Sequence, residues 1–425
     1  MDASAAQPST LAAPNVASVA VEPGELPRTM LAWVMRPERE GDLAAAYEIE
    51  EVEAPEPGPF EVVVRVMAAG VNFNSIWAAR AEPISIFPYG DHPRWGHHIA
   101  GSDGSGIVWK VGAGVERWQP GDEIVIQANH ASYEDPEVHG LDPLAAPSQL
   151  GYGYQTTWGT FAQFAKVQAQ QLVPKSPSLS WVDASAYGVT YFTAYRMLVD
   201  QCRLAAGHRV LVWGGAGGLG VFAVQLCRAA GAQALAVVST PEKGEIATRL
   251  GAVGYLDRTE FAGMISRGDE SPDEERERQA AMRAFARRVR EMLGDAPDIV
   301  FEHVGRETFP TSVFVAKRFG KIVTCGATSG YRLGFDVRHL WMRQKQIIGS
   351  HAFNAYEAWR ANELVPERIR PVLWRALPFA ELPEAHRLVD ENRHVGKIAI
   401  RIGARDDAEG KTAPGAGALW IDSAV

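Results

Sequence analysis

A glycine-rich segment between two apolar stretches constrains this chain more than any other feature. Residues 214–220 read GGAGGLG, directly after the apolar run 208–213 and before the apolar-periodic run 221–230. A second apolar run, 233–238, completes a strand, loop, helix and strand within about 30 residues, the length of one βαβ unit. Glycines let a backbone approach a pyrophosphate, and the helix start supplies N–H donors and the positive end of a dipole. The pattern predicts a dinucleotide site, rather than a tight turn alone, held by Gly215, Gly217, Gly218, Leu219 and Gly220.

The end of the second strand distinguishes between dinucleotides. An NAD-binding chain usually places an acidic residue there, where it bonds the ribose 2′-hydroxyl. This chain instead has Ser239 and Thr240, followed by Lys243. A hydroxyl and an ammonium suit a 2′-phosphate, so the sequence favours NADPH. The alternative for Lys243 is an ordinary exposed lysine in the first turn of a helix.

Strand-like and helix-like stretches alternate after residue 180, which predicts a doubly wound parallel α/β sheet. A helix is expected over 181–198 and further strands over 298–302, 320–324 and 346–349. Before residue 180, short β-segments at 61–67, 106–111 and 123–127 are separated by glycine and proline turns. That spacing is typical of a compact, barrel-like β-rich unit.

Composition narrows the class of protein. The 42 basic and 51 acidic side chains give a net charge of −9, which argues against a nucleic-acid or anionic-membrane partner. The apolar runs are strand-sized and too short to span a membrane. Cys202, Cys227 and Cys325 form no CxxC or Cys/His cluster, so we expect neither a disulfide framework nor a structural zinc. With no secretory signal at the start, a cytoplasmic location is expected.

Several longer motifs carry a family resemblance. They are VNFNSIW (71–77), Glu82-Pro83, GSD (101–103), FEHVGRETF (301–309), TSGY (328–331), LWM (340–342), IIGSH (347–351) and EAWRAN (357–362). From residue 29 to 403 the chain resembles crotonyl-CoA carboxylase/reductases and related 2-enoyl-CoA carboxylases of the medium-chain dehydrogenase/reductase superfamily. The resemblance implies NADPH-dependent reductive carboxylation of an α,β-unsaturated acyl-CoA, crotonyl-CoA or longer, to an alkylmalonyl-CoA. It also implies an enoyl-CoA or enoyl-acyl carrier thioester as substrate, CO2 as co-substrate, and a homodimer or homotetramer.

The resemblance also divides the chain. A discontinuous GroES-like catalytic domain would occupy residues 29–184 and 350–403, with a Rossmann NADPH-binding domain over 185–349. Residues 263–282 form a dense mixed-charge run that we expect to be a solvated insertion with a helical end. Residues 1–28 and 404–425 are rich in small residues, and we expect a mobile leader and a loose tail.

The family's CO2 pocket maps onto four positions by motif. Asn74 is the second asparagine of VNFNSIW, His351 ends IIGSH, and Tyr154 and Gln155 fall at the positions of an aromatic residue and a glutamate. A carboxylate only accepts hydrogen bonds and can pair with an imidazolium, whereas a carboxamide is neutral and also donates. His351 therefore lacks a bias toward its charged form, and we expect carboxylation to compete less well with protonation. An enoyl-thioester reductase without carboxylation and a non-catalytic NADPH-binding protein remain as alternatives.

Further residues are expected around the two ligands. The resemblance places Gly326 and His339 with the cofactor, and Glu82, Tyr331 and Arg338 with the substrate. Arg287 and Arg288 lie on a predicted helix beside an aromatic ring, and guanidinium forks suit the phosphates of CoA. An equally compatible interpretation is a solvated helix face paired with the acidic run before it.

No catalytic metal is expected. Zinc-dependent members of the superfamily hold the metal with a cysteine and a His-Glu pair. This chain has Asn72 and Ser102-Asp103 at those positions, and amides and hydroxyls are poor zinc ligands. For the adjacent His97 and His98 we expect a solvent-facing or loop role.

Overall fold

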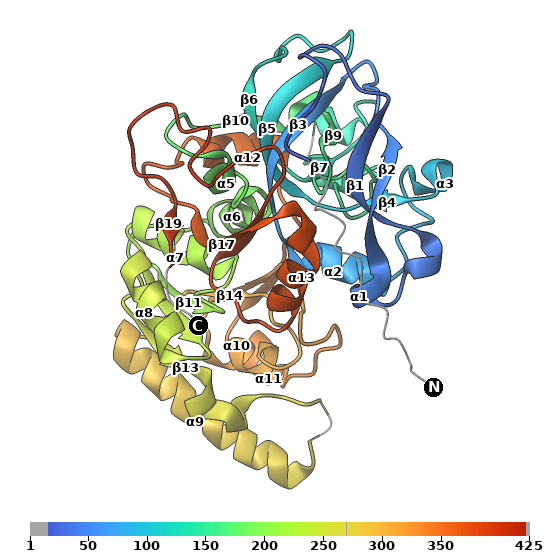
Figure 1. The fold of residues 1–425 in the computed structure, drawn as a ribbon. Helices are drawn as coiled ribbons and strands as arrows, with labels where there is room; N and C mark the ends of the chain where they lie inside the picture. Colours follow the sequence, from blue (N-terminus) through green and yellow to red (C-terminus); the bar gives the residue numbers. More distant parts are fainter. Residues whose placement is uncertain (1–15, 141, 269, 422–425) are drawn as a thin grey trace, which may run out of the picture.

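The computed structural model describes residues 16–140, 142–268 and 270–421, which form two domains (Figure 1). One domain is built around a parallel sheet of six strands in the order β13-β12-β11-β14-β15-β16. Its strands are β11 (Arg209–Trp213), β12 (Gln233–Val238), β13 (Gly254–Asp257), β14 (Ile299–Glu302), β15 (Lys321–Thr324) and β16 (Gln346–Gly349). The order reverses between β11 and β14, which opens a crevice at the carboxyl ends of these two strands.

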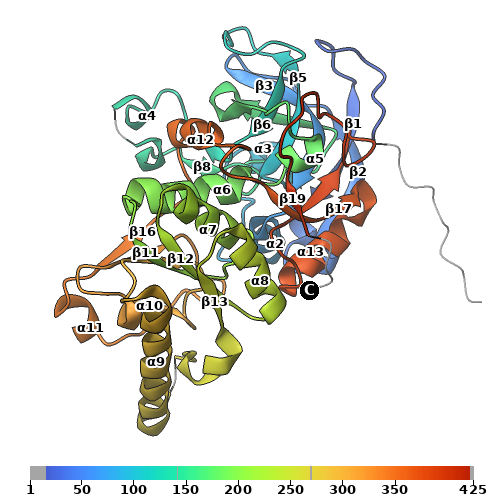
Figure 2. The ribbon, with the colours of Figure 1, turned by 90° about the vertical axis from the view of Figure 1, so that its left-hand side faces the viewer.

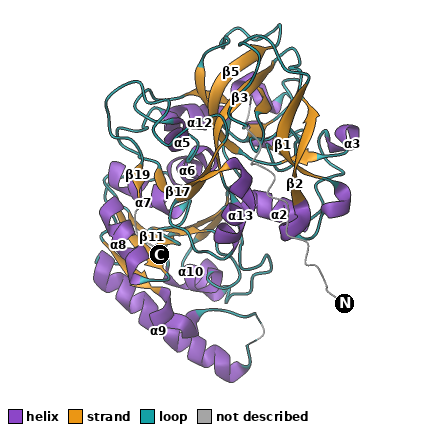
Figure 3. Ribbon diagram, viewed as in Figure 1, coloured by secondary structure: helices purple, strands orange, loops and turns teal. Residues whose placement is uncertain are grey.

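Helices cover both faces of this sheet, as Figure 3 shows. Val210 and Val212 of β11 pack with α7 (Gly220–Ala229) on one face, and Leu211 and Trp213 pack with α9 (Pro272–Leu293) on the other. A parallel strand buried on both faces needs an unbroken apolar run, which is why the sequence pattern located these strands closely. The remaining helices of the domain are α8 (Pro241–Leu250), α10 (Phe309–Val315) and α11 (Arg338–Trp341).

The second domain is β-rich. Its main sheet has the order β10-β6-β5-β3-β18-β17-β19, with β9 also pairing β3, and smaller sheets have the orders β2-β1-β4 and β7-β8. β18 (Lys397–Arg401) pairs antiparallel with β3 (Glu61–Gly70), so the chain leaves this domain and later returns to it. The other strands are β1 (Thr29–Met35), β2 (Tyr47–Glu53), β4 (His98–Ile99), β5 (Asp103–Val111), β6 (Glu123–Ile126), β7 (Asn129–His130), β8 (Leu150–Gly151), β9 (Phe164–Gln168), β10 (Leu172–Pro174), β17 (Val372–Pro378) and β19 (Leu419–Trp420). Together the two domains confirm the predicted fold class.

Short helices join the two domains. The helix expected over 181–198 is broken into α5 (Trp181–Ala184), α6 (Gly188–Tyr195) and a π-helical turn, Arg196–Gln201. The break has a physical cause, because Asp103 accepts a hydrogen bond from the backbone N–H of Val189 and a Cβ on Gly188 would lie 2.8 Å from the Asp103 carboxylate. α6 packs between α7 and α12 (Ala355–Asn362), as Figure 2 shows. Elsewhere lie α1 (Leu43–Ala46), α2 (Phe73–Arg80), α3 (His92–Trp95), α4 (Glu137–Gly140), α13 (Leu382–Asp390) and 3₁₀ turns at Pro37–Arg39, Pro143–Ala145, Ala169–Gln171, Arg258–Met264 and Phe379–Glu381.

Two segments differ from the mobile leader and loose tail that we expected. Within the leader, residues 16–28 are described and packed, because the buried Arg65 guanidinium donates to the Val16 carbonyl at 2.7 Å; residues 1–15 lie outside the described residues. In the tail, β19 pairs with β17, Ile421 is buried, and Trp181 N–H donates to the Glu409 carbonyl at 2.8 Å. Backbone carbonyls make these contacts, and composition does not reveal them.

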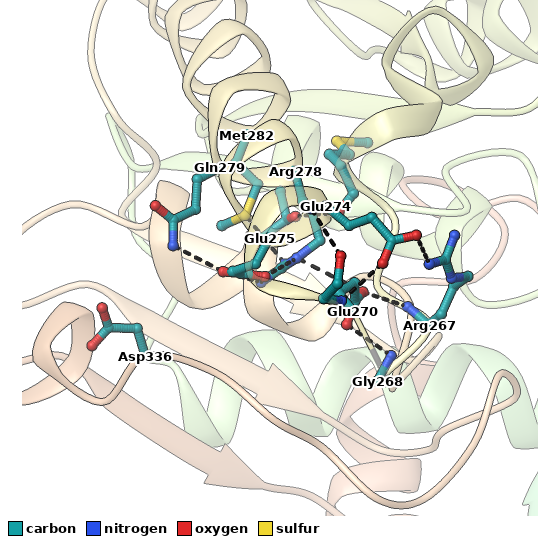
Figure 4. A network of polar contacts seen from close by, with 12 residues as sticks. Arg267, Gly268, Glu270, Glu274, Glu275, Arg278, Gln279, Met282 and Asp336 are labelled. Carbon is teal, nitrogen blue, oxygen red and sulfur yellow. Dashed lines mark hydrogen bonds and ion pairs between the residues drawn. The ribbon is translucent and has the colours of Figure 1, made fainter.

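The charged run at 263–282 enters the first half of α9, which projects from the domain (Figures 1 and 2). Figure 4 shows its side chains pairing with one another: Arg278 lies 2.7 Å from Glu275, and Arg267 lies 2.5 Å from Glu274. Arg278 and Met282 are nevertheless buried. The run is therefore solvated only in part. No described helix has the length and apolar character needed to cross a bilayer.

Candidate active site

A cavity of about 990 Å³ lies between the two domains, at the carboxyl ends of the parallel strands. The loops after β11, β14 and β15 line it from one domain, and α2, residues 149–155 and residues 351–353 line it from the other. Segments that are far apart in sequence therefore meet around one space. Its position at the reversal of strand order is where doubly wound sheets bind ligands.

The glycines of the glycine loop, residues 214–220, have two roles: some allow close packing, and others line the cavity. A Cβ on Gly215 would lie 2.5 Å from the Ala236 Cβ, and one on Gly220 would lie 2.1 Å from the Gly214 carbonyl, so these two glycines allow close packing. Gly217 and Gly218 line the cavity with Leu219. A Cβ on Gly218 would lie 3.5 Å from Gly396, Lys397 and Thr190, which is ordinary van der Waals contact, so packing within the protein does not require glycine there. The loop thus fits a pyrophosphate at the start of α7.

Lys243 is a buried cation beside this loop. It is 8 % exposed, it faces the cavity with Ser239, and its Nζ donates to the Asn392 carbonyl at 2.9 Å. Burial lowers the pKa of Lys243, and the nearby Arg258 charge lowers it further. Within the described part of the chain no carboxylate pairs with it, and a buried charge without a counter-ion suits an anionic ligand. Arg258, which also lines the cavity, was missed in the sequence because no motif marks it.

Glu302 belongs to the FEHVGRETF motif, which gave no role to this residue, and it orders the loop after β14. Its fully buried carboxylate accepts hydrogen bonds from the backbone N–H of Val304 at 2.7 Å and from the Ser312 hydroxyl at 2.7 Å. His303 is held there with its Nε2 3.0 Å from the Trp213 carbonyl, just before the glycine loop. His303 and Val304 line the cavity as a result.

All four residues expected in the CO2 pocket line this cavity. Asn74, in the first turn of α2, donates from Nδ2 to the Ser102 hydroxyl at 2.6 Å. Gln155 accepts at Oε1 from the backbone N–H of Gly151 at 3.0 Å. The Tyr154 hydroxyl donates to the Glu82 carbonyl at 2.8 Å, and burial raises the pKa of Tyr154 to about 12. Glu82, which we expected to contact the substrate, therefore bonds Tyr154 through its backbone carbonyl and not through its carboxylate.

His351 faces the cavity from the loop before α12. Partial removal from water lowers its pKa, and the positive charge of Arg196 lowers it further. Arg196 is held by Glu357 of α12 at 2.5 Å and by Asp142. Both effects favour the neutral form of the imidazole.

The positions that would hold zinc form a buried ion pair instead. Lys397 Nζ lies 3.0 Å from the Asp103 carboxylate, and Asn72 donates to the same carboxylate at 2.9 Å. Lys397 also donates to the Val71 carbonyl at 2.8 Å. Among residues 16–140, 142–268 and 270–421 no group of His, Cys, Asp and Glu could hold a metal ion. Sequence reasoning missed Lys397, although a buried aspartate implies a cationic partner.

For His97 and His98 we expected a solvent-facing or loop role, and neither faces solvent. His97 lies in the loop just before β4 and is 7 % exposed, whereas His98 is fully buried because it belongs to β4, which pairs with β1. His98 Nδ1 lies 2.8 Å from His92 Nε2, and burial lowers the pKa of His98 well below its usual value.

The structure does not bring all the remaining residues predicted to bind the cofactor or the substrate to this cavity. Gly326 and Tyr331 line the cavity, but Arg338 pairs with Asp336 at 2.6 Å and His339 packs against Phe314, outside the lining. Arg287 and Arg288 are exposed on α9, where Arg288 pairs with Glu291 at 3.2 Å. The aromatic ring beside them, Phe285, stacks on Trp213 under the sheet. The solvated-face interpretation of this helix therefore fits the structure better.

Comparison with known proteins agrees with this geometry. The family model "Alcohol dehydrogenase GroES-like domain" matches residues 58–177, and "Zinc-binding dehydrogenase" matches residues 218–365. Crotonyl-CoA carboxylase/reductase of Cereibacter sphaeroides is 43% identical, over 90% of this chain and 89% of that protein. Crotonyl-CoA reductase of Streptomyces collinus is 39% identical, over 88% of this chain and 85% of that protein.

Solved structures point the same way. The 2-octenoyl-CoA carboxylase reductase CinF, in complex with NADP and 2-octenoyl-CoA, is 38% identical with a TM-score of 0.87, covering 92% of this chain and 91% of that one. Crotonyl-CoA carboxylase/reductase AntE, in complex with NADP, is 42% identical with a TM-score of 0.85, covering 91% of this chain and 98% of that one. By sequence and by both domains, the chain belongs to the crotonyl-CoA carboxylase/reductase family of the medium-chain dehydrogenases/reductases.

Proposed function

We propose that the protein catalyses NADPH-dependent reductive carboxylation of a 2-enoyl-CoA. NADPH supplies the hydride that adds to Cβ of the substrate. The electron pair of the Cα=Cβ bond then forms an enolate of the thioester, and its Cα bonds to the carbon of CO2 to give an alkylmalonyl-CoA carboxylate. The observation that carries this proposal is that Asn74, Tyr154, Gln155 and His351 line the same cavity as the glycine loop.

The chain's own residues have two tasks in this reaction. Amide and imidazole N–H groups of Asn74, Gln155 and His351 would donate to the CO2 oxygens as charge develops on them. Apolar side chains would keep water from the enolate, because protonation gives the saturated acyl-CoA instead. The cavity wall supplies these in Trp77 and Ile86, with Phe353 on the opposite segment.

We propose that NADPH binds to the glycine loop and to the polar residues beside it in the cavity. Gly217, Gly218 and the start of α7 would hold the pyrophosphate, and Lys243 with Ser239 would hold the 2′-phosphate. CoA is the carrier we propose, because CinF, with its 2-octenoyl-CoA complex, shares this fold over most of the chain.

Product analysis tests the proposal. The enzyme is incubated with NADPH and crotonyl-CoA, with and without bicarbonate and carbonic anhydrase, and the acyl-CoA products are identified by mass spectrometry. We expect ethylmalonyl-CoA only when CO2 is supplied. Butyryl-CoA as the sole product would instead establish a simple enoyl-CoA reductase, the alternative that Gln155 favours, and absence of NADPH oxidation would indicate a non-catalytic protein.

We further propose a homodimer that forms through β16. This strand is an edge of the parallel sheet, and Gln346, Ile347 and Gly349 on it are exposed. Trp341 and Met342 of the neighbouring segment are 63% and 56% exposed. An uncovered edge strand beside large exposed apolar side chains is typical of an interface.

A further inference from the structure

The Asn74 side chain is bonded at one end only. Its Nδ2 donates to the Ser102 hydroxyl at 2.6 Å, while its Oδ1 is buried and has no partner among the described residues. A buried carbonyl oxygen without a donor is unfavourable. In this arrangement the donor end of the amide is engaged and the acceptor end is unpaired.

This arrangement is the opposite of what CO2 needs. The oxygens of CO2 only accept hydrogen bonds, and they gain negative charge as the new C–C bond forms, so they need N–H donors. Turning the amide by 180° about its Cβ–Cγ bond exchanges the two ends within the same volume. Oδ1 would then face Ser102, and Nδ2 would be free to donate to CO2.

Ser102 has the one property that both orientations require. A hydroxyl accepts from Nδ2 in the first orientation and donates to Oδ1 in the second. We propose that Ser102 is a positioning residue for carboxylation: it bonds the Asn74 amide in either orientation and so lets Asn74 present its N–H groups to CO2. This inference rests on the proposed function, because it assumes that CO2 binds at Asn74.

The surroundings of Ser102 hold its hydroxyl in place while the amide turns. Thr160 N–H donates to the Gly101 carbonyl at 2.9 Å, and Gly101 has a φ of +107° with no room for a side chain. On the other side, Asp103 is bound in the buried ion pair with Lys397. Ser102 itself is 1 % exposed. The backbone is thus anchored on both sides of the hydroxyl.

Ser102→Ala tests the proposal through the ratio of carboxylated to protonated product, which does not depend on how much enzyme is folded. Loss of one hydrogen bond at the pocket should lower this ratio about tenfold and raise the apparent KM for CO2, but not the KM for NADPH. Ser102→Thr, which keeps a hydroxyl, should restore the ratio. Ser105→Ala is the matched control, because the Ser105 hydroxyl is also buried on β5 but donates to the Trp181 carbonyl at 2.6 Å.

A double-mutant cycle separates positioning from packing. If Ser102 acts through Asn74, Ser102→Ala should change the ratio in the native enzyme and leave it unchanged in an Asn74→Ala background. Equal effects in both backgrounds, or an equal fall in Ser105→Ala, would overturn the positioning role. So would an unchanged ratio in Ser102→Ala while the native enzyme carboxylates. A native enzyme that makes no carboxylated product at all would overturn the proposed function, and this inference with it.

Discussion

The side-chain oxygen of Gln155 accepts a hydrogen bond from the backbone N–H of Gly151, at 3.0 Å. Because a backbone N–H only donates, this bond decides which end of the amide is oxygen. The amide nitrogen is then left without a hydrogen-bond partner in the described part of the chain, on a residue that lines the cavity. A glutamate in the same rotamer would keep the bond to Gly151 and place a second carboxylate oxygen where the nitrogen now lies.

Gln155→Glu should therefore raise the share of carboxylated product. A carboxylate at position 155, one of the four positions expected to form the CO2 pocket with His351, favours the charged form of that histidine, whose pKa is lowered in the present enzyme by burial and by Arg196. The charged imidazole is a stronger donor to the forming carboxylate. Mass spectrometry of the products, at saturating NADPH and fixed CO2 between pH 6 and 8, gives the ratio directly.

Gln149→Glu is the control for this experiment. Gln149 also lines the cavity, and its amide donates to Asn129 at 3.3 Å. The same added charge at this position should leave the product ratio as it is. An unchanged ratio in Gln155→Glu, or an equal rise in both variants, would contradict the pocket assignment.

Lys243→Ala should weaken the binding of NADPH much more than that of NADH. Hydrogen bonds to charged groups contribute about 1.5–3 kcal/mol, so the KM for NADPH should rise roughly 10- to 100-fold. NADH has no 2′-phosphate, and its KM should change little. Steady-state kinetics with both cofactors measure the difference, with Lys110→Ala, a lysine that pairs with Glu56 on the other domain, as control. A similar loss for both cofactors would remove Lys243 from the phosphate site.

Local patterns predicted the cofactor domain well, and long-range contacts explain what they missed. The expected strand 233–238 coincides with β12, and the expected helix 221–230 is α7 to within one residue at each end. Both elements are determined by neighbouring residues, namely the apolar periodicity of the segment and the adjoining glycine loop. The pair of Asp103 and Lys397 joins two strands that lie far apart in the chain, and neither residue has a partner visible locally.

In the candidate site, too, local motifs identified some residues, whereas the positions of others depend on tertiary packing. Motifs placed Asn74, Gln155 and His351 in one cavity, because each belongs to a short segment with its own pattern. Arg287 and Arg288 were expected there on residue type alone, and the period of α9 turns them to solvent while Phe285 packs inward. Residue type indicates what a side chain can bind, whereas tertiary packing decides what it can reach.

Ile347→Lys should convert the proposed dimer to a monomer. A lysine on the edge strand β16 places a charge where two apolar surfaces would meet, and edge lysines oppose strand pairing. Size-exclusion chromatography with light scattering gives the mass of each species. Val253→Lys is the control, because Val253 is 48% exposed just before β13 at the opposite edge of the same sheet. A dimer that persists in Ile347→Lys would exclude β16 as the interface.

His386 should make the folded protein sensitive to acid. Its ring is 2 % exposed, lies 3.0 Å from the Ser75 hydroxyl, and burial lowers its pKa from 6.5 to about 3. Above pH 6.5 the imidazole is neutral in both the folded and the unfolded chain, so it adds no pH dependence. Below pH 6.5 the unfolded chain takes up a proton that the folded protein binds only near pH 3. The free energy of unfolding should therefore fall by about 1.4 kcal/mol per pH unit over this window from His386 alone.

Urea unfolding at pH 7.5 and pH 5.5 measures this effect in the native chain and in His386→Gln. The variant should be less stable at pH 7.5, because it loses packing against Tyr47 and Phe161. Its stability should nevertheless change less between the two pH values, by about 1.4 kcal/mol, since one imidazole no longer titrates in the unfolded state only. Other histidines whose pKa is lowered in the folded protein still contribute to the pH dependence of stability, and His394, with its pKa lowered to about 4, is one of them. An identical pH dependence in both proteins would mean that His386 takes up its proton equally in the folded and unfolded chain.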